Sequence, residues 1–88
     1  MTVRLAEDGA VHLEGDCSVE EAETLLAALL DQPAAAVDWR RCRGAHTAVV
    51  QVLIALRPPM MGEPDDEFLR RWIAPFLPAA ISSEPQGR

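Results

Sequence analysis

Three arginines within four residues form the densest positive charge of a sequence that is acidic overall. Arg40, Arg41 and Arg43 belong to an 88-residue chain with a formal net charge of −6. Guanidinium groups bind carboxylates and phosphates through charge-assisted hydrogen bonds. His46 and Thr47 follow closely, and a threonine hydroxyl is a target for phosphorylation. The sequence therefore predicts a partner-binding surface from Arg40 to Thr47, where an acidic partner or phosphorylated Thr47 pairs with the arginines.

The same residues also have a purely structural interpretation. An apolar run begins at Ala48, and Thr47 stands where the N-cap of a helix would lie. Threonine is a common cap. Arginines on a protein surface are often simply solvated, since exposed ion pairs contribute little. Both interpretations remain open at the level of the sequence.

Two cysteines and one histidine form a second group with possible chemistry. Thiolates and imidazole nitrogens are zinc ligands, and Cys17, Cys42 and His46 would meet if both cysteines follow strands of one sheet. No Cys-x-x-Cys pair and no obvious fourth ligand accompany them. The sequence therefore favours two small, reduced, half-buried thiols, with no metal and no cofactor.

Support for catalysis is weak. No serine stands at a recognisable spacing from a base and an orienting acid, and the sequence has no glycine-rich phosphate loop. Glu14, Asp16 and Asp38 could gather as carboxylates at strand ends, where such groups are usually solvated. We therefore expect that the protein is not an enzyme.

Composition narrows the range of partners. Fourteen acidic residues against eight basic ones disfavour general binding to nucleic acid, which requires a positive field. The first residues lack the apolar run of a signal peptide, and no stretch approaches the ~18 apolar residues of a membrane span. These features predict a cytoplasmic protein that binds neither nucleic acid nor membrane.

The first half of the chain predicts a hairpin. Apolar and polar residues alternate over residues 3–5 and 11–14, on either side of the turn dipeptide Asp8-Gly9, and Gly15-Asp16 would end the second strand.

An amphipathic helix follows. Ser18 and Glu21 have the spacing of a capping box, and leucines at helical spacing form one face as far as Asp31. Pro33 prevents the helix from continuing. The short apolar run from Ala34 to Trp39 then predicts a strand parallel to the second one, because a strand, a helix and a strand form a βαβ unit.

The second half of the chain predicts two more helices. Residues 40–44 would be a polar connection into a second helix, which starts near His46 or Thr47 and is apolar on almost every side, as if two of its faces were buried. A loop from Pro58 to Pro64 would precede a third helix capped by Asp65 or Asp66. The apolar face of that helix would hold Phe68, Leu69, Trp72, Ile73 and Phe76.

These elements predict an α/β fold: a small mixed sheet, made of the N-terminal hairpin and a parallel strand, packed against about three helices. Residues 1–77 would form a single domain, and residues 78–88 a flexible tail.

The order of a hairpin, a capped helix, a short strand and a buried helix resembles the STAS domain, the fold of anti-sigma-factor antagonists. Residues 11–16 are similar to the second strand of that family and the glycine turn after it, and residues 18–26 to its first helix. Val37-Asp38-Trp39 resembles the family's V-D-L strand. Residues 46–53 stand where the family carries D-S-S/A-G-L and the helix behind it. The resemblance covers residues 3–56.

This resemblance implies a non-enzymatic protein-interaction module of bacterial signal transduction, with a kinase-like or anti-sigma-type regulatory partner. In many family members a kinase phosphorylates a serine of the D-S-S-G segment and switches binding off; Thr47 occupies that position here. His46 replaces the aspartate, and Val49 replaces the glycine. The alternative is a self-associating structural or adaptor subunit without a phospho-switch, because apolar second and third helices could bury a homodimer interface.

Overall fold

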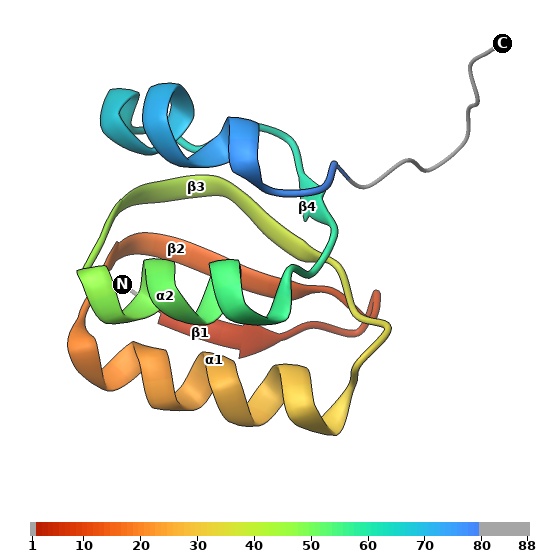
Figure 1. The fold of residues 1–88 in the computed structure, drawn as a ribbon. Coiled ribbons are helices and arrows are strands. Elements are labelled where there is room, and N and C mark those ends of the chain that lie inside the picture. Colours follow the sequence, from red (N-terminus) through yellow and green to blue (C-terminus); the bar gives the residue numbers. More distant parts are fainter. Residues whose placement is uncertain (1, 80–88) are drawn as a thin grey trace, which may run out of the picture.

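The computed structural model describes residues 2–79, which form a four-stranded mixed sheet and three helical segments (Figure 1). The strands lie in chain order across the sheet: β1 (Thr2–Leu5), β2 (Val11–Cys17), β3 (Val37–Ala45) and β4 (Met60–Met61). β1 is antiparallel to β2, whereas β2, β3 and β4 are mutually parallel. The predicted α/β class, with a mixed sheet and three helices, is confirmed.

The N-terminal hairpin turns at the predicted glycine. Gly9 has a φ of 84°, a left-handed conformation that glycine adopts without steric cost. Buried and half-buried residues alternate over residues 11–14, as the sequence predicts. The prediction that Gly15-Asp16 ends the strand is wrong. Gly15 takes a φ of 72° inside β2, next to a shift in its pairing with β3, and the strand continues to Cys17.

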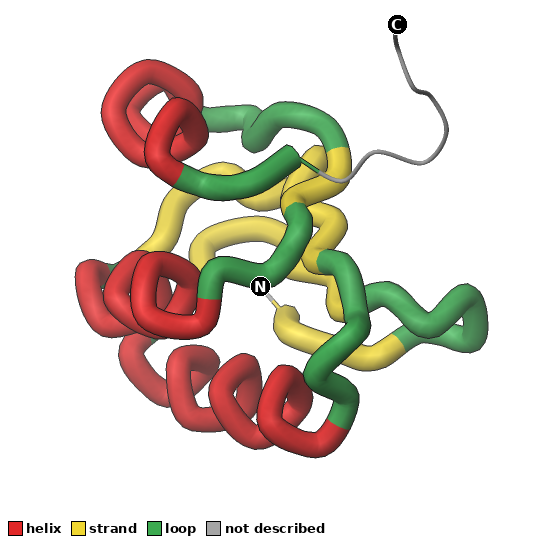
Figure 2. The backbone as a smooth tube through the Cα atoms, turned by 45° about the vertical axis from the view of Figure 1, so that its right-hand side comes forward, coloured by secondary structure: helices red, strands yellow, loops and turns green. Residues whose placement is uncertain are grey.

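Two helices cover the same face of the sheet and lie side by side (Figures 1 and 2). In α1 (Val19–Asp31), the predicted apolar face is buried at Ala22, Leu25 and Leu29, whereas Leu26 and Leu30 are exposed. The Ser18 side chain makes no cap hydrogen bond, so the capping box is not formed. In α2 (Thr47–Leu56), Val49 and Leu53 are buried, while 45% of Ile54 is exposed. The prediction that α2 is buried on two faces is therefore wrong.

β3 is longer than predicted. The predicted strand ended at Trp39 and was followed by a polar connection over residues 40–44, but the strand continues to Ala45. Trp39 and Cys42 are buried, whereas the three arginines between and beside them are exposed. A strand with one uncovered face can hold arginines without burying them. The predicted binding segment is thus mostly strand.

The predicted loop between Pro58 and Pro64 contains β4. Met60 and Met61 pair with the start of β3, and Met60 is buried. The Met60 N–H donates to the Pro78 carbonyl at 2.8 Å, and Ala79 bridges to Met60. The predicted flexible tail is therefore wrong for Pro78 and Ala79, and its remainder, residues 80–88, lies outside the described residues.

The third helix is the C-terminal helical segment, residues 67–76. It begins after Asp66, whose carboxylate accepts the Leu69 N–H at 2.9 Å, as the predicted cap requires. It then widens into a π-helical turn, η1 (Leu69–Ile73), and ends in a 3-10 turn, η2 (Ala74–Phe76). The segment lies beside β3, away from α1 and α2 (Figure 1).

Only part of the predicted apolar face of this segment is buried. Leu69 is 1% exposed and Ile73 is half-buried. Phe68, Trp72 and Phe76 are 60%, 57% and 66% exposed, so the predicted apolar face is divided between the core and the surface.

Candidate functional site

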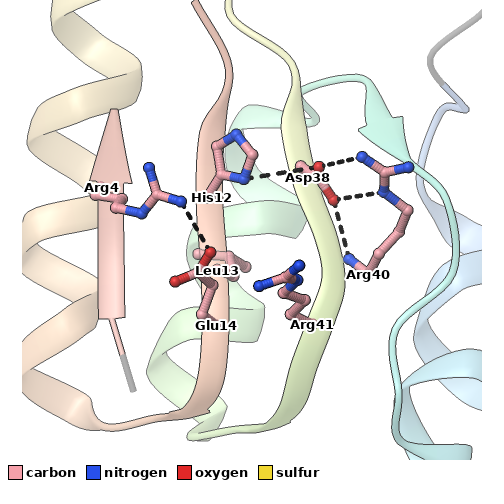
Figure 3. A pocket seen from close by; sticks show the side chains of 7 residues that line it. All are labelled: Arg4, His12, Leu13, Glu14, Asp38, Arg40 and Arg41. Atoms are coloured by element: carbon pink, nitrogen blue, oxygen red, sulfur yellow. Dashed lines mark hydrogen bonds and ion pairs between the residues drawn. The ribbon is translucent and has the colours of Figure 1, made fainter. Parts of the chain in front are cut away.

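A polar hollow of about 520 Å³ lies on the sheet face opposite α1 and α2 (Figure 3). Strand pairing builds it. Arg4 of β1 lies opposite His12 of β2, which in turn lies opposite Asp38 of β3. In the next row Glu14 lies opposite Arg41. The complete lining is Arg4, His12, Leu13, Glu14, Asp38, Arg40 and Arg41.

Asp38 and Arg40 form the best-defined ion pair of the hollow. They are two residues apart in β3, a spacing that places side chains on the same face of a strand. Arg40 Nε donates to Asp38 Oδ1 at 3.0 Å, and Nη2 donates to Oδ2 at 2.6 Å. The Arg40 backbone N–H also donates to Oδ1, at 3.1 Å. Asp38 is 5% exposed, the one buried charged residue between positions 2 and 79.

This pairing shifts the pKa of both groups in the direction that favours their charged forms. The hydrogen-bonded Arg40 guanidinium holds the pKa of Asp38 below its usual range, although burial of the carboxyl opposes the shift. Asp38 in turn raises the pKa of Arg40. The guanidinium of Arg40 therefore has a partner within the fold.

Gly62 fixes the position of the Arg40 side chain. It has a φ of 72°, and a Cβ added there would collide with Cγ and Cδ of Arg40. The Gly62 carbonyl accepts a hydrogen bond from Trp39 Nε1 at 2.9 Å. The loop after β4 therefore packs against two consecutive residues of β3.

His12 lies between two carboxylates. Its Nδ1 is 3.6 Å from Asp38 Oδ2, and its Nε2 is 3.4 Å from Asp8 Oδ2. A neutral imidazole can donate from only one nitrogen, whereas the protonated ring can donate to both carboxylates. Alternation along β2 places His12 on the outer face of the sheet, but the sequence does not reveal its partners, because these depend on strand register.

The arginines of the hollow differ in their pairing. Arg4 Nη2 donates to Glu14 Oε2 at 3.0 Å, and this contact is the main cause that lowers the pKa of Glu14. Arg41 forms no hydrogen bond or ion pair between its side chain and any other residue of the range 2–79, and the same holds for Arg43. Two of the three predicted arginines are therefore available to an external anion.

The remaining predicted residues lie outside the hollow. Arg43 is exposed near the end of β3. His46 is the N-cap residue of α2, and its Nδ1 accepts the Ala48 N–H at 3.0 Å. Thr47 is the first residue of α2 and is exposed, so the interpretation of Thr47 as the cap is wrong. The predicted surface thus has two parts, the hollow and the junction of β3 with α2.

Cys17 and Cys42 lie close together on neighbouring strands, and both are buried free thiols. Cys17 Sγ donates to the Glu14 carbonyl at 3.9 Å, and Cys42 Sγ donates to the Gly44 carbonyl at 3.3 Å. The neighbouring Cys42 thiol and burial raise the pKa of Cys17. His46 contacts Cys17 through its backbone N–H rather than its ring. Over residues 2–79, no three His, Cys, Asp or Glu side chains form a cluster suited to a metal ion.

No protein-family model, curated protein or solved structure matches this chain. Over residues 2–79, no helix combines the length and the apolar character needed to cross a membrane. The fold and the site define a small α/β domain with helices on one sheet face and a charged hollow on the other. The lining of the hollow contains guanidinium, imidazole and carboxylate groups but no hydroxyl or thiol nucleophile. Its arrangement is suited to binding charged groups.

Proposed function

We propose that this chain is a non-enzymatic protein-interaction module that binds an acidic segment of a regulatory partner through Arg41 and Arg43. One observation carries the proposal. Within residues 2–79, every other arginine contacts a carboxylate or a backbone carbonyl through its side chain. The side chains of Arg41 and Arg43 make no such contact.

The position of these two arginines suits an extended acidic partner. Arg41 and Arg43 flank buried Cys42 in β3, so both point away from the core. Side chains two residues apart in a strand are separated by roughly 6.6 Å, the same repeat as in an extended peptide. A partner segment with acidic side chains at alternate positions would therefore match both guanidinium groups.

The resemblance to the STAS domain supplies the signalling context, with a kinase-like or anti-sigma-type protein as the proposed partner. Thr47 stands exposed just beyond the end of β3. Its phosphorylation would add about −1.5 to −2 charges four residues after Arg43 in the chain. The phosphate would repel an acidic partner and compete for the same guanidinium groups, which switches binding off.

Affinity capture from extracts of the cells that produce the protein tests the binding surface. The bait is wild type or the double variant Arg41→Ala/Arg43→Ala, and the matched control is Arg70→Ala/Arg71→Ala, which removes the same charge elsewhere. We expect the Arg41→Ala/Arg43→Ala bait to capture at least ~10-fold less of a partner protein than the wild-type and control baits capture. Equal capture by all three baits would refute the proposal, as would capture that is insensitive to salt.

Variants of Thr47 test the switch separately. Thr47→Glu should weaken capture of the same partner several-fold, because it places negative charge four residues after Arg43 in the chain, whereas Thr47→Ala should leave capture unchanged. Both variants should remain folded, since Thr47 is exposed and His46 provides the cap. Equal capture by Thr47→Glu and Thr47→Ala would rule out charge at this position as the control.

A further inference from the structure

The C-terminal helical segment carries two apolar stripes with the same four-residue spacing. Leu69, Ile73 and Leu77 form the inner stripe, in which Leu69 and Leu77 are buried and Ile73 is half-buried. The outer stripe, here called the aromatic face, consists of Phe68, Trp72 and Phe76, each more than half exposed.

The aromatic face is unusual for this chain. Its three residues are three of the four aromatic residues in the whole sequence; the fourth, Trp39, is buried. Large aromatic side chains contribute most to the energy of protein interfaces, and a contiguous exposed group of them is typical of an interaction surface.

The two ends of the aromatic face carry opposite charge. At the Phe68 end, the side chains of Asp65 and Glu67 are exposed; Glu67 Oε2 lies 3.6 Å from Arg71 Nη1 of the same copy, whereas Asp65 forms no ion pair within the described residues. At the Phe76 end, Arg57 reaches the Phe76 carbonyl with Nη1 at 2.8 Å. In the middle, Arg71 lies over the Trp72 ring, 5.7 Å from its centroid. The charge therefore changes from acidic to basic along the face.

We infer that the aromatic face binds a second copy of this chain in an antiparallel, two-fold symmetric dimer. Phe68 and Phe76 each stand four residues from Trp72 in the sequence, so an axis near Trp72 would place Phe68 of each copy against Phe76 of the other. The same axis brings the acidic end of each copy to Arg57 of its partner. Both the spacing and the charge are thus self-complementary. This inference is independent of the proposed function, which uses a different surface.

The size of the face sets the strength of the dimer. At 57–66% exposure, the three aromatics present roughly 350–400 Å² of surface per copy. This is about half of the ~800 Å² per partner of a standard interface. Flanking residues add to it, but the dimer should be weak and reversible, with a dissociation constant on the order of 10–100 µM.

Sedimentation equilibrium over a concentration series tests the aromatic face. Wild type should change from monomer to dimer, and Trp72→Ala should weaken the dimer by at least ~10-fold. The control Leu30→Ala removes an apolar side chain of α1 that is 62% exposed, and it should change nothing. A wild type that stays monomeric up to ~500 µM would overturn the inference and leave the face to a different protein. Equal weakening by Leu30→Ala would also overturn it.

A charge exchange tests the antiparallel geometry. Asp65 makes no side-chain contact with a charged group in the described structure, so Asp65→Lys changes little within one copy. At low salt, Asp65→Lys and Arg57→Glu should each weaken the dimer about 3- to 10-fold, and the double variant should recover most of the loss. A double variant weaker than both single variants would contradict the proposed arrangement. Circular dichroism of each variant verifies that the fold is intact.

Discussion

Replacing Arg40 by alanine should destabilise the protein far more than the same change at its neighbour Arg41. Arg40→Ala removes two charge-assisted hydrogen bonds to Asp38, at 3.0 and 2.6 Å. The Asp38 side chain is 7% exposed and would keep only a backbone N–H and His12 beside it. Hydrogen bonds to charged groups contribute about 1.5–3 kcal/mol each.

Solvent reduces this magnitude, because the Arg40 side chain is 61% exposed. We therefore expect Arg40→Ala to lower the free energy of unfolding by about 2 kcal/mol near neutral pH. The Arg41 side chain has no hydrogen-bond or ion-pair partner among residues 2–79, so Arg41→Ala should stay within about 0.5 kcal/mol of wild type. Urea unfolding followed by tryptophan fluorescence measures both values. Equal losses in the two variants would refute the assignment of Arg40 to structure and Arg41 to binding.

The pH dependence of the Arg40→Ala effect provides a second assay. Pairing lowers the pKa of Asp38 in the folded state, so its contribution is present above the unfolded pKa, near pH ~4, and is lost as pH falls through the folded value. Without Arg40, burial remains and the Asp38 pKa rises. The difference between wild type and Arg40→Ala should therefore be largest near neutral pH and shrink below about pH 4. A difference that stays constant from neutral to acid pH would show that the charge of Asp38 is not its source.

Two further predictions concern the support of the site. Gly62→Ala should lower the free energy of unfolding in urea by about 2–3 kcal/mol, because it combines an unfavourable φ with a clash against Arg40. Gly9→Ala has free space around its Cβ and should lower it by about 1–2 kcal/mol, from the unfavourable φ alone. Equal losses would argue against packing of Arg40 on Gly62. Cys17 and Cys42 are both buried, so iodoacetamide should alkylate them slowly in the folded protein and rapidly in urea; fast alkylation under native conditions would contradict their burial.

The elements with clear periodicity could be predicted from the sequence. The hairpin follows from alternation around Asp8-Gly9, and α1 follows from leucines at helical spacing before Pro33. The predicted third strand ends too early, at Trp39, because consecutive arginines are typical of a loop unless one face of the sheet is uncovered. β4 has only two residues, whose pairing with β3 is a tertiary contact without local signal.

The site could be predicted only in part. Asp38 and Arg40 are two residues apart in a strand, so their pairing could have been found by extending β3. The contacts of His12 with Asp8 and Asp38 depend on the register between strands, which residue types do not specify. Likewise, both apolar stripes of the C-terminal helical segment suit burial, and only the packed structure decides which one faces the core.

Site-specific photo-crosslinking in living cells tests the proposed function most directly. A photoreactive p-benzoylphenylalanine replaces Thr47, which follows β3 in the chain, or Glu23, which is exposed on the neighbouring helix α1. We predict that the Thr47 probe forms a crosslink to another protein, that Arg41→Ala/Arg43→Ala abolishes this crosslink, and that the Glu23 probe does not form it. A crosslink that persists in the double arginine variant, or that forms only from position 23, would contradict the proposed binding surface.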